Sequence, residues 1–94
     1  MHMNDLEKAR QDIALADREL AAAFGRRMAA ARRAAAVKKE LGLPVFDAQQ
    51  ENKVLELNSA YVEDEELRPY YLSLLREAIR LSRVYQQELM EKGE

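Results

Sequence analysis

Two cations interrupt the apolar side of a long predicted helix. Apolar residues recur there at steps of three and four, the spacing that places side chains on one helix face, at Leu6, Ala9, Ile13, Ala16, Leu20, Phe24, Ala31, Ala34 and Leu41. Arg27 and Lys38 fall on the same stripe, about 16 Å apart along the helix axis. A buried cation is costly unless an anion meets it, so the pair predicts a pocket for a small anion. In the plainer alternative, both residues bury only their stems and keep their charges in water.

Two further pairs of polar residues lie on faces that should pack against this helix. Asp47 and Glu51 are one helical turn apart, and so are Ser82 and Gln86. Each residue has a plain structural interpretation. Asp47 suits a helix cap, Glu51 complements a helix dipole, Ser82 can bond to its own helix, and Gln86 can lie at the surface. Together with the two cations, however, the four residues favour a polar site between three helices.

Arg10 adds a geometric constraint. It lies 17 residues before Arg27, which places it about 25 Å away along the axis and rotated by about 100°. It therefore cannot share a pocket with Arg27 of its own straight helix. In an antiparallel dimer the partner's Arg10 could approach Arg27 and complete a site made by both chains. Taken alone, Arg10 is compatible with an ordinary solvated charge.

The first helix is predicted from Asn4 or Asp5 to Leu41. Asn4 suits the N-cap, with Glu7 three residues later in capping-box spacing. Gly42 suits the position just after the helix, and the proline at position 44 cannot continue it.

Two shorter helices complete the predicted all-α fold. The second begins with Asp47 as its N-cap and extends to about Ala60. Pro69 suits the first position of the third, which carries one stripe from Tyr71 to Leu89. The expected order is thus one long, one short and one long helix.

The length of the first helix predicts an intertwined homodimer. A helix of this span is about 55 Å long, whereas a compact chain of 94 residues has a radius of gyration near 12 Å. Two shorter helices cannot cover it, so a second copy, related by a twofold axis, is expected to do so.

Composition narrows the function classes. The 94 residues fit a single domain over residues 1–94, in which residues 1–3, including the single histidine His2, are interpreted as a cloning remnant. The absence of cysteine argues against disulfides and thiolate metal sites. The acidic run at residues 63–66 lacks calcium-loop spacing, so no metal site is expected.

A net charge of -2 argues against nucleic acid as a partner. No signal peptide or membrane span is recognised, so a cytoplasmic location is expected.

The polar residues and their surroundings resemble the all-helical class of chorismate mutases from about Leu6 to Leu89. The similar stretches are ARQDI at 9–13, GRRM at 25–28, VKK at 37–39, PVFD at 44–47 followed by Glu51, and Ser82 with Gln86. The resemblance implies an intertwined dimer of three-helix chains. It also implies the rearrangement of chorismate to prephenate in phenylalanine and tyrosine biosynthesis, a reaction that needs no metal or redox cofactor.

The resemblance also implies a role for each residue. Arg27 would bind one substrate carboxylate, and Arg10 of the partner chain would bind the other. Lys38 and Gln86 would donate to the ether oxygen of the breaking bond.

The remaining residues would position the substrate. Glu51 and the backbone at Asp47 would hold the ring hydroxyl, and Ser82 would help to place a carboxylate. One departure is visible, because family members often have an arginine where this chain has Gln50.

Two alternatives stay open. An isochorismate-pyruvate lyase on the same fold would need the same cationic pocket, although the Asp47 and Glu51 pair favours the mutase. A non-enzymatic helical interaction module would leave Arg27 and Lys38 without anions.

Overall fold

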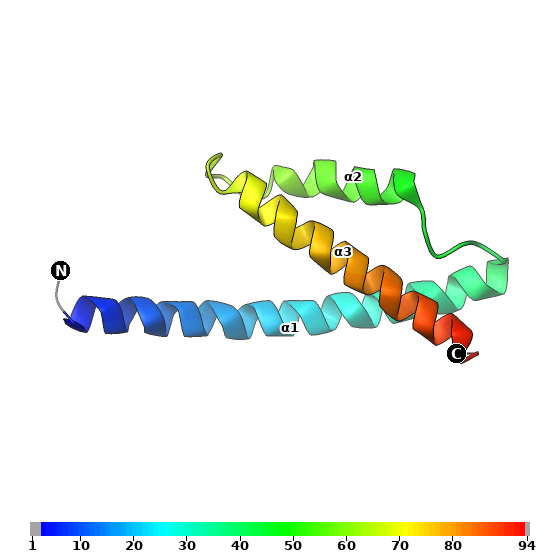
Figure 1. The fold of residues 1–94 in the computed structure, drawn as a ribbon, viewed down its shortest axis with the longest axis horizontal. Coiled ribbons are helices and arrows are strands. Elements are labelled where there is room, and N and C mark those ends of the chain that lie inside the picture. The colour runs from blue at the N-terminus through cyan, green and yellow to red at the C-terminus, as the bar shows by residue number, and fades with distance from the viewer. Residues whose placement is uncertain (1–2, 94) are drawn as a thin grey trace.

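The structure, a computed structural model, describes residues 3–93, and these form three α-helices with no strand among them. Helix α1 spans Met3–Leu41, α2 spans Ala48–Ser59 and α3 spans Arg68–Glu91 (Figure 1). The predicted all-helical order is confirmed. Two of the three residues interpreted as a cloning remnant, Met1 and His2, lie outside the described residues.

The predicted N-cap of α1 is wrong, whereas its predicted C-terminal end is confirmed. The helix already includes Met3 and Asn4, so Asn4 lies in the first turn and is not the cap. First-turn N–H groups can be satisfied by water, which is why the helix can extend past a favourable capping residue. At the other end, Gly42 adopts a left-handed φ of 69°. Leu43 N donates to Lys38 O at 2.8 Å and Gly42 N to Lys39 O at 3.3 Å, the two bonds of a Schellman motif.

Helix α2 begins as its sequence predicts. The Asp47 side chain accepts a hydrogen bond from Gln50 N at 3.1 Å, which satisfies one of the free N–H groups of the first turn. The helix ends at Ser59 with Ala60 as its C-cap, in agreement with the expected end.

Helix α3 begins one residue earlier than its proline predicts. Arg68 is its first residue and Pro69 its second. The reason is that Leu67 is already helical (φ -87°, ψ -17°) and its carbonyl accepts from Tyr71 N at 3.0 Å. Proline is tolerated there because N–H groups of the first turn have no partner within the helix.

Helix α3 connects the other two helices, since it contacts both α1 and α2. It crosses the C-terminal half of α1, with α2 on its other side (Figure 1). The buried apolar residues are small on α1 and large on α3: Ala31, Ala35, Leu75, Ile79 and Leu89. Alanine permits close approach of two helices, so the alanine-rich part of α1 is the part on which α3 packs.

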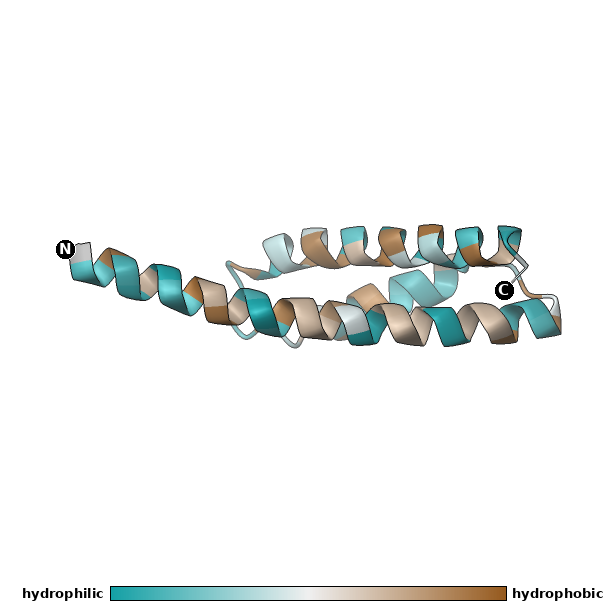
Figure 2. Ribbon diagram, turned by 90° about the horizontal axis from the view of Figure 1, so that it is seen from below, coloured by the Kyte–Doolittle hydropathy of each residue, from teal (hydrophilic) through white to brown (hydrophobic). Residues whose placement is uncertain are grey.

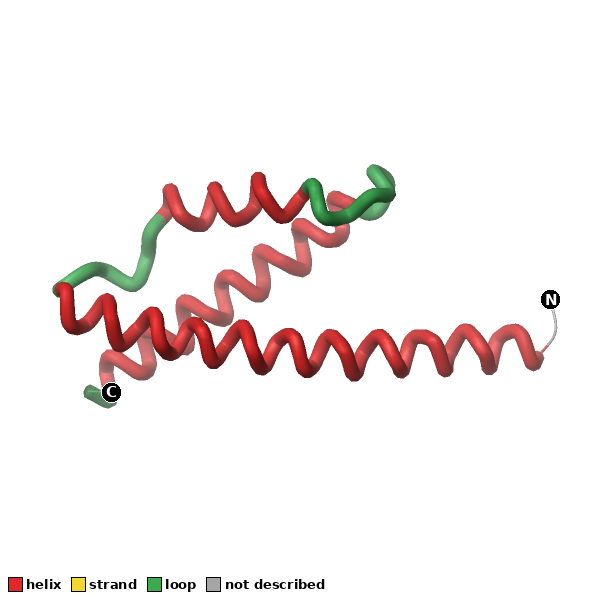
Figure 3. Tube along the Cα trace, turned by 180° about the vertical axis from the view of Figure 1, so that it is seen from behind, coloured by secondary structure: helices red, strands yellow, loops and turns green. Residues whose placement is uncertain are grey.

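The N-terminal half of α1 projects beyond the other two helices (Figures 1 and 3). The chain extends 58 × 27 × 14 Å, with a radius of gyration of 17.0 Å, well above the value near 12 Å for a compact chain of this length. The predicted stripe residues Leu6, Ile13, Leu20 and Phe24 are 39–59% exposed, and apolar turns recur along this part of the helix (Figure 2). A single chain therefore leaves a long apolar face uncovered.

None of the helices within residues 3–93 combines the length and the apolarity that a bilayer span requires.

Candidate active site

A cavity of about 440 Å³ lies between the three helices. Its walls include six of the seven residues that the sequence predicts for a site, two from α1, two from the start of α2 and two from α3: Arg27, Lys38, Asp47, Glu51, Ser82 and Gln86. Alanine, valine and isoleucine side chains supply the apolar part of the lining. The size and the mixed lining suit a small polar molecule.

Arg27 is half-buried and oriented by α3. Its Nη1 donates a short hydrogen bond to Ser82 Oγ and a longer one, 3.4 Å, to Ala78 O. Ser82, itself 8% exposed, donates to Ala78 O at 2.9 Å, so the bond back to its own helix is confirmed. Both acceptors of Arg27 are neutral oxygens, and no carboxylate among residues 3–93 forms an ion pair with it. The guanidinium is therefore available to an anionic ligand.

Lys38 and Gln86 form a second polar group that joins α1 to α3. Lys38 Nζ donates to Gln86 Oε1 and to Val45 O, both at 2.9 Å. Gln86 is 7% exposed, and its Nε2 donates to Ala31 O at 3.0 Å. An ammonium carries three N–H donors and an amide two, so each side chain keeps a donor for a ligand in the cavity.

The two carboxylates on α2 differ in exposure and partner. Asp47 is exposed and caps α2, which confirms its structural interpretation. Glu51 is half-buried, and both of its oxygens accept from Arg83 Nη1, at 3.0 and 2.9 Å. The partner of Glu51 is thus a specific guanidinium and not only the dipole of α2.

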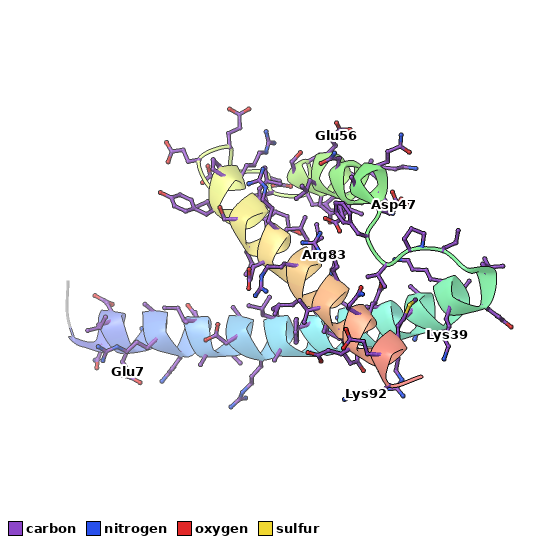
Figure 4. The ribbon with its side chains drawn as sticks, turned by 45° about the vertical axis from the view of Figure 1, so that its right-hand side comes forward. Glu7, Lys39, Asp47, Glu56, Arg83 and Lys92 are labelled. Carbon is purple, nitrogen blue, oxygen red and sulfur yellow. The ribbon has the colours of Figure 1, made fainter. Side chains whose placement is uncertain are left out.

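Arg83 is the charged lining residue that sequence reasoning missed. It extends from α3 on the side facing α2 (Figure 4), and its guanidinium carbon lies 5.0 Å from the centroid of the Phe46 ring. It lies three residues before Gln86, a spacing that places both on one helix side. That spacing was the available signal, but the partners of Arg83, Phe46 and Glu51, are distant from it in sequence.

Arg10 lies outside the cavity lining of its own chain. It is exposed on the projecting half of α1, in keeping with the constraint that it cannot share a pocket with Arg27 of the same helix. Its approach to a partner's pocket stays a prediction.

The lining of the cavity is positively charged. Three cations, Arg27, Lys38 and Arg83, face two carboxylates, Asp47 and Glu51, which leaves one positive charge.

Two further charged groups on α3 lie outside this lining. A hydrogen bond from Arg80, assisted by its charge, lowers the pKa of Glu77 and raises the pKa of Arg80 in return. This pair is exposed and does not contribute to the charge of the cavity lining.

Among the described positions, no group of three or more histidine, cysteine or acidic residues is placed to hold a metal ion.

Fold and cavity together define an all-helical protein with a positively charged candidate site between its helices. The family model described as chorismate mutase type II matches residues 9–87, and the chain therefore belongs to that family. The matched span contains all seven predicted site residues, and the family supports chorismate mutase, an isomerase, as the general activity. Searches of curated proteins and of solved structures found no match.

Proposed function

We propose that this chain catalyses the intramolecular rearrangement of chorismate to prephenate, a step of phenylalanine and tyrosine biosynthesis. The observation that carries the proposal is the convergence of Arg27, Lys38 and Gln86 from two helices on one cavity. Chorismate carries two carboxylates, and the cavity presents an arginine that has no anionic partner among residues 3–93, beside a lysine and an amide with spare donors. Neither a nucleophile nor a proton transfer is needed, so positioning and electrostatics are the protein's tasks.

The first task is to hold the substrate in a compact, reactive conformer. Arg27 binds one carboxylate through its guanidinium fork. Ser82 supports this role because its hydroxyl fixes one nitrogen of that fork. Glu51 and the backbone at Asp47 hold the ring hydroxyl at the opposite wall.

The second task is to stabilise the negative charge that develops on the ether oxygen as its bond to carbon breaks. Lys38 and Gln86 donate to this oxygen. Their mutual hydrogen bond and their bonds to Val45 and Ala31 hold them in place before the substrate binds. Preorganised donors of this kind favour the transition state, because they need no rearrangement as the charge appears.

We also propose that the chain acts as an intertwined homodimer with one domain per chain. The support is the uncovered apolar face of α1 from Leu6 to Phe24, which is longer than a monomer of this size normally exposes. The partner's α1 would cover this face and bring its Arg10 to the cavity, where it would bind the second carboxylate. Sedimentation equilibrium should give twice the chain mass of 10.8 kDa. A monomer at micromolar concentration would contradict the shared site.

The activity is tested by incubating the purified chain with chorismate and identifying the product by NMR. Saturable formation of prephenate supports the mutase. Release of pyruvate from isochorismate, without prephenate from chorismate, would instead indicate the lyase. Turnover of neither substrate would favour a helical interaction module.

Gln86→Glu is expected to confine activity to acid pH. The amide of Gln86 donates at every pH, whereas a carboxyl at this position donates only while it is protonated. Activity of the variant should therefore fall as the pH rises through the pKa of the new carboxyl, while kcat of the parent chain stays constant over the same range. Rate–pH profiles of both proteins measure this difference. A flat profile for the variant would contradict donation by Gln86.

A further inference from the structure

We infer that Arg83 is a positioning residue that offsets the charge of Glu51, so that this carboxylate can accept the substrate's hydroxyl without repelling the substrate dianion. The inference rests on the proposed function and extends it to a residue that the family resemblance did not point to. It follows from three features of Arg83, namely its contact with both Glu51 oxygens, its contact with an aromatic ring, and its effect on the charge of the cavity.

The contact with Glu51 leaves the carboxylate able to bind. Arg83 Nη1 lies 3.0 and 2.9 Å from the two oxygens, so a single nitrogen bridges them. A carboxylate offers about four acceptor positions, and this bridge occupies one on each oxygen. The remaining positions can accept a hydroxyl from a ligand in the cavity that Glu51 lines.

The aromatic contact fixes the guanidinium. Its central carbon lies 5.0 Å from the centroid of Phe46, within the range of a cation–π interaction. The side chains of Arg83 and Glu51 are 35% and 25% exposed, so the pair is screened less than a pair on the open surface. Arg83 is therefore held between α2 and α3 at the edge of the cavity.

The charge of the cavity depends on Arg83. With it, one protomer presents one net positive charge, and without it the cations and carboxylates of the lining would balance. Adding the proposed Arg10 of the partner chain gives two positive charges, which match the two carboxylates of chorismate.

The residue before Glu51 cannot offset its charge. Gln50 lines the same cavity next to Glu51 and is neutral. The single cation of α2, Lys53, is not part of the lining, so Arg83 on α3 is the lining cation that contacts Glu51.

The test is steady-state kinetics with chorismate on Arg83→Met and Arg83→Lys. Arg83→Met should raise KM about tenfold, because an unbalanced carboxylate then faces the substrate, with a smaller change in kcat. Arg83→Lys should stay within about threefold of the parent KM, since one nitrogen suffices for the bridge. Arg80→Met, one turn earlier on α3 and exposed, is the matched control and should leave both constants unchanged.

Two double variants separate positioning from a structural role. In the Glu51→Gln background the carboxylate charge is gone, so adding Arg83→Met should change KM less than about twofold. Adding Gln50→Arg to Arg83→Met should lower KM most of the way back to the parent value, because it restores a cation beside Glu51. Thermal unfolding of every variant shows which of them are folded. If Arg83→Met does not fold, Arg83→Gln replaces it with the same expectation.

The outcomes that overturn the inference are distinct. An unchanged KM in folded Arg83→Met removes the role of Arg83 while leaving the mutase activity established. Equal effects of Arg83→Met with and without Glu51→Gln would show that Arg83 contacts the substrate itself. No turnover of chorismate by the parent chain would overturn the proposed function and this inference with it.

Discussion

Replacing Lys38 with alanine is expected to lower kcat by about 10²–10³, the usual loss when a preorganised donor to a developing oxyanion is removed. KM should rise much less, because the ether oxygen gains its negative charge only as the bond breaks. The structure gives a second reason to expect a lower kcat. Lys38 also donates to Gln86 Oε1, so its loss leaves the amide that serves the same oxygen with only its bond to Ala31 O to hold it.

The matched control for this variant is Lys39→Ala. Lys39 neighbours Lys38 in the last turn of α1 but is exposed, so it tests the loss of a cation near this helix end without loss of the donor. Single-turnover and steady-state rates on both variants separate chemistry from binding. A rise in KM with unchanged kcat in Lys38→Ala would show that Lys38 binds substrate without stabilising the transition state.

Replacing Arg27 with alanine is expected to lower kcat/KM by about 10²–10³, which lies within the range for removing one partner of a buried, hydrogen-bonded charge pair. The loss should appear in both kcat and KM, because Arg27 holds a carboxylate that is present in the ground state and in the transition state. Arg27→Lys should recover only part of the loss, since an ammonium keeps the charge but lacks the planar fork.

The control for Arg27 is its neighbour Arg26, which is exposed on the same helix. Arg26→Ala should retain the parent's kcat/KM, and circular dichroism should show unchanged helix content in both variants. Equal losses at positions 26 and 27 would indicate a general effect of charge and would contradict specific binding of a carboxylate by Arg27.

Local signals in the sequence predicted the helices well. Gly42 and Asp47 mark an end and a beginning correctly, because a left-handed glycine and a side-chain cap act within one turn of the chain. Asn4 placed the start of α1 one or two residues too late and Pro69 placed the start of α3 one residue too late, since first-turn N–H groups tolerate either a cap or solvent. Helical periodicity also predicted correctly that Arg27 and Lys38 line one cavity.

Contacts between distant segments were harder to predict. Ser82 was interpreted both as bonding to its own helix and as part of a site, and its hydroxyl contacts Ala78 and Arg27 together. Arg83 was missed because its partner Glu51 lies 32 residues away and no periodicity within α3 reveals that ion pair. Arg10 depends on a second chain, which the sequence of one chain can suggest only through helix length.

The shared site is tested most directly by pairing two defective chains. Arg10→Ala and Arg27→Ala should each be nearly inactive as homodimers. In a heterodimer, purified through two different tags after co-expression, Arg27 of the first chain and Arg10 of the second would form one intact site while the other site lacks both. Prephenate formation at about half the parent rate per dimer is the expected result, since one of two sites is intact. A heterodimer no more active than either homodimer would contradict a chorismate site built from both chains.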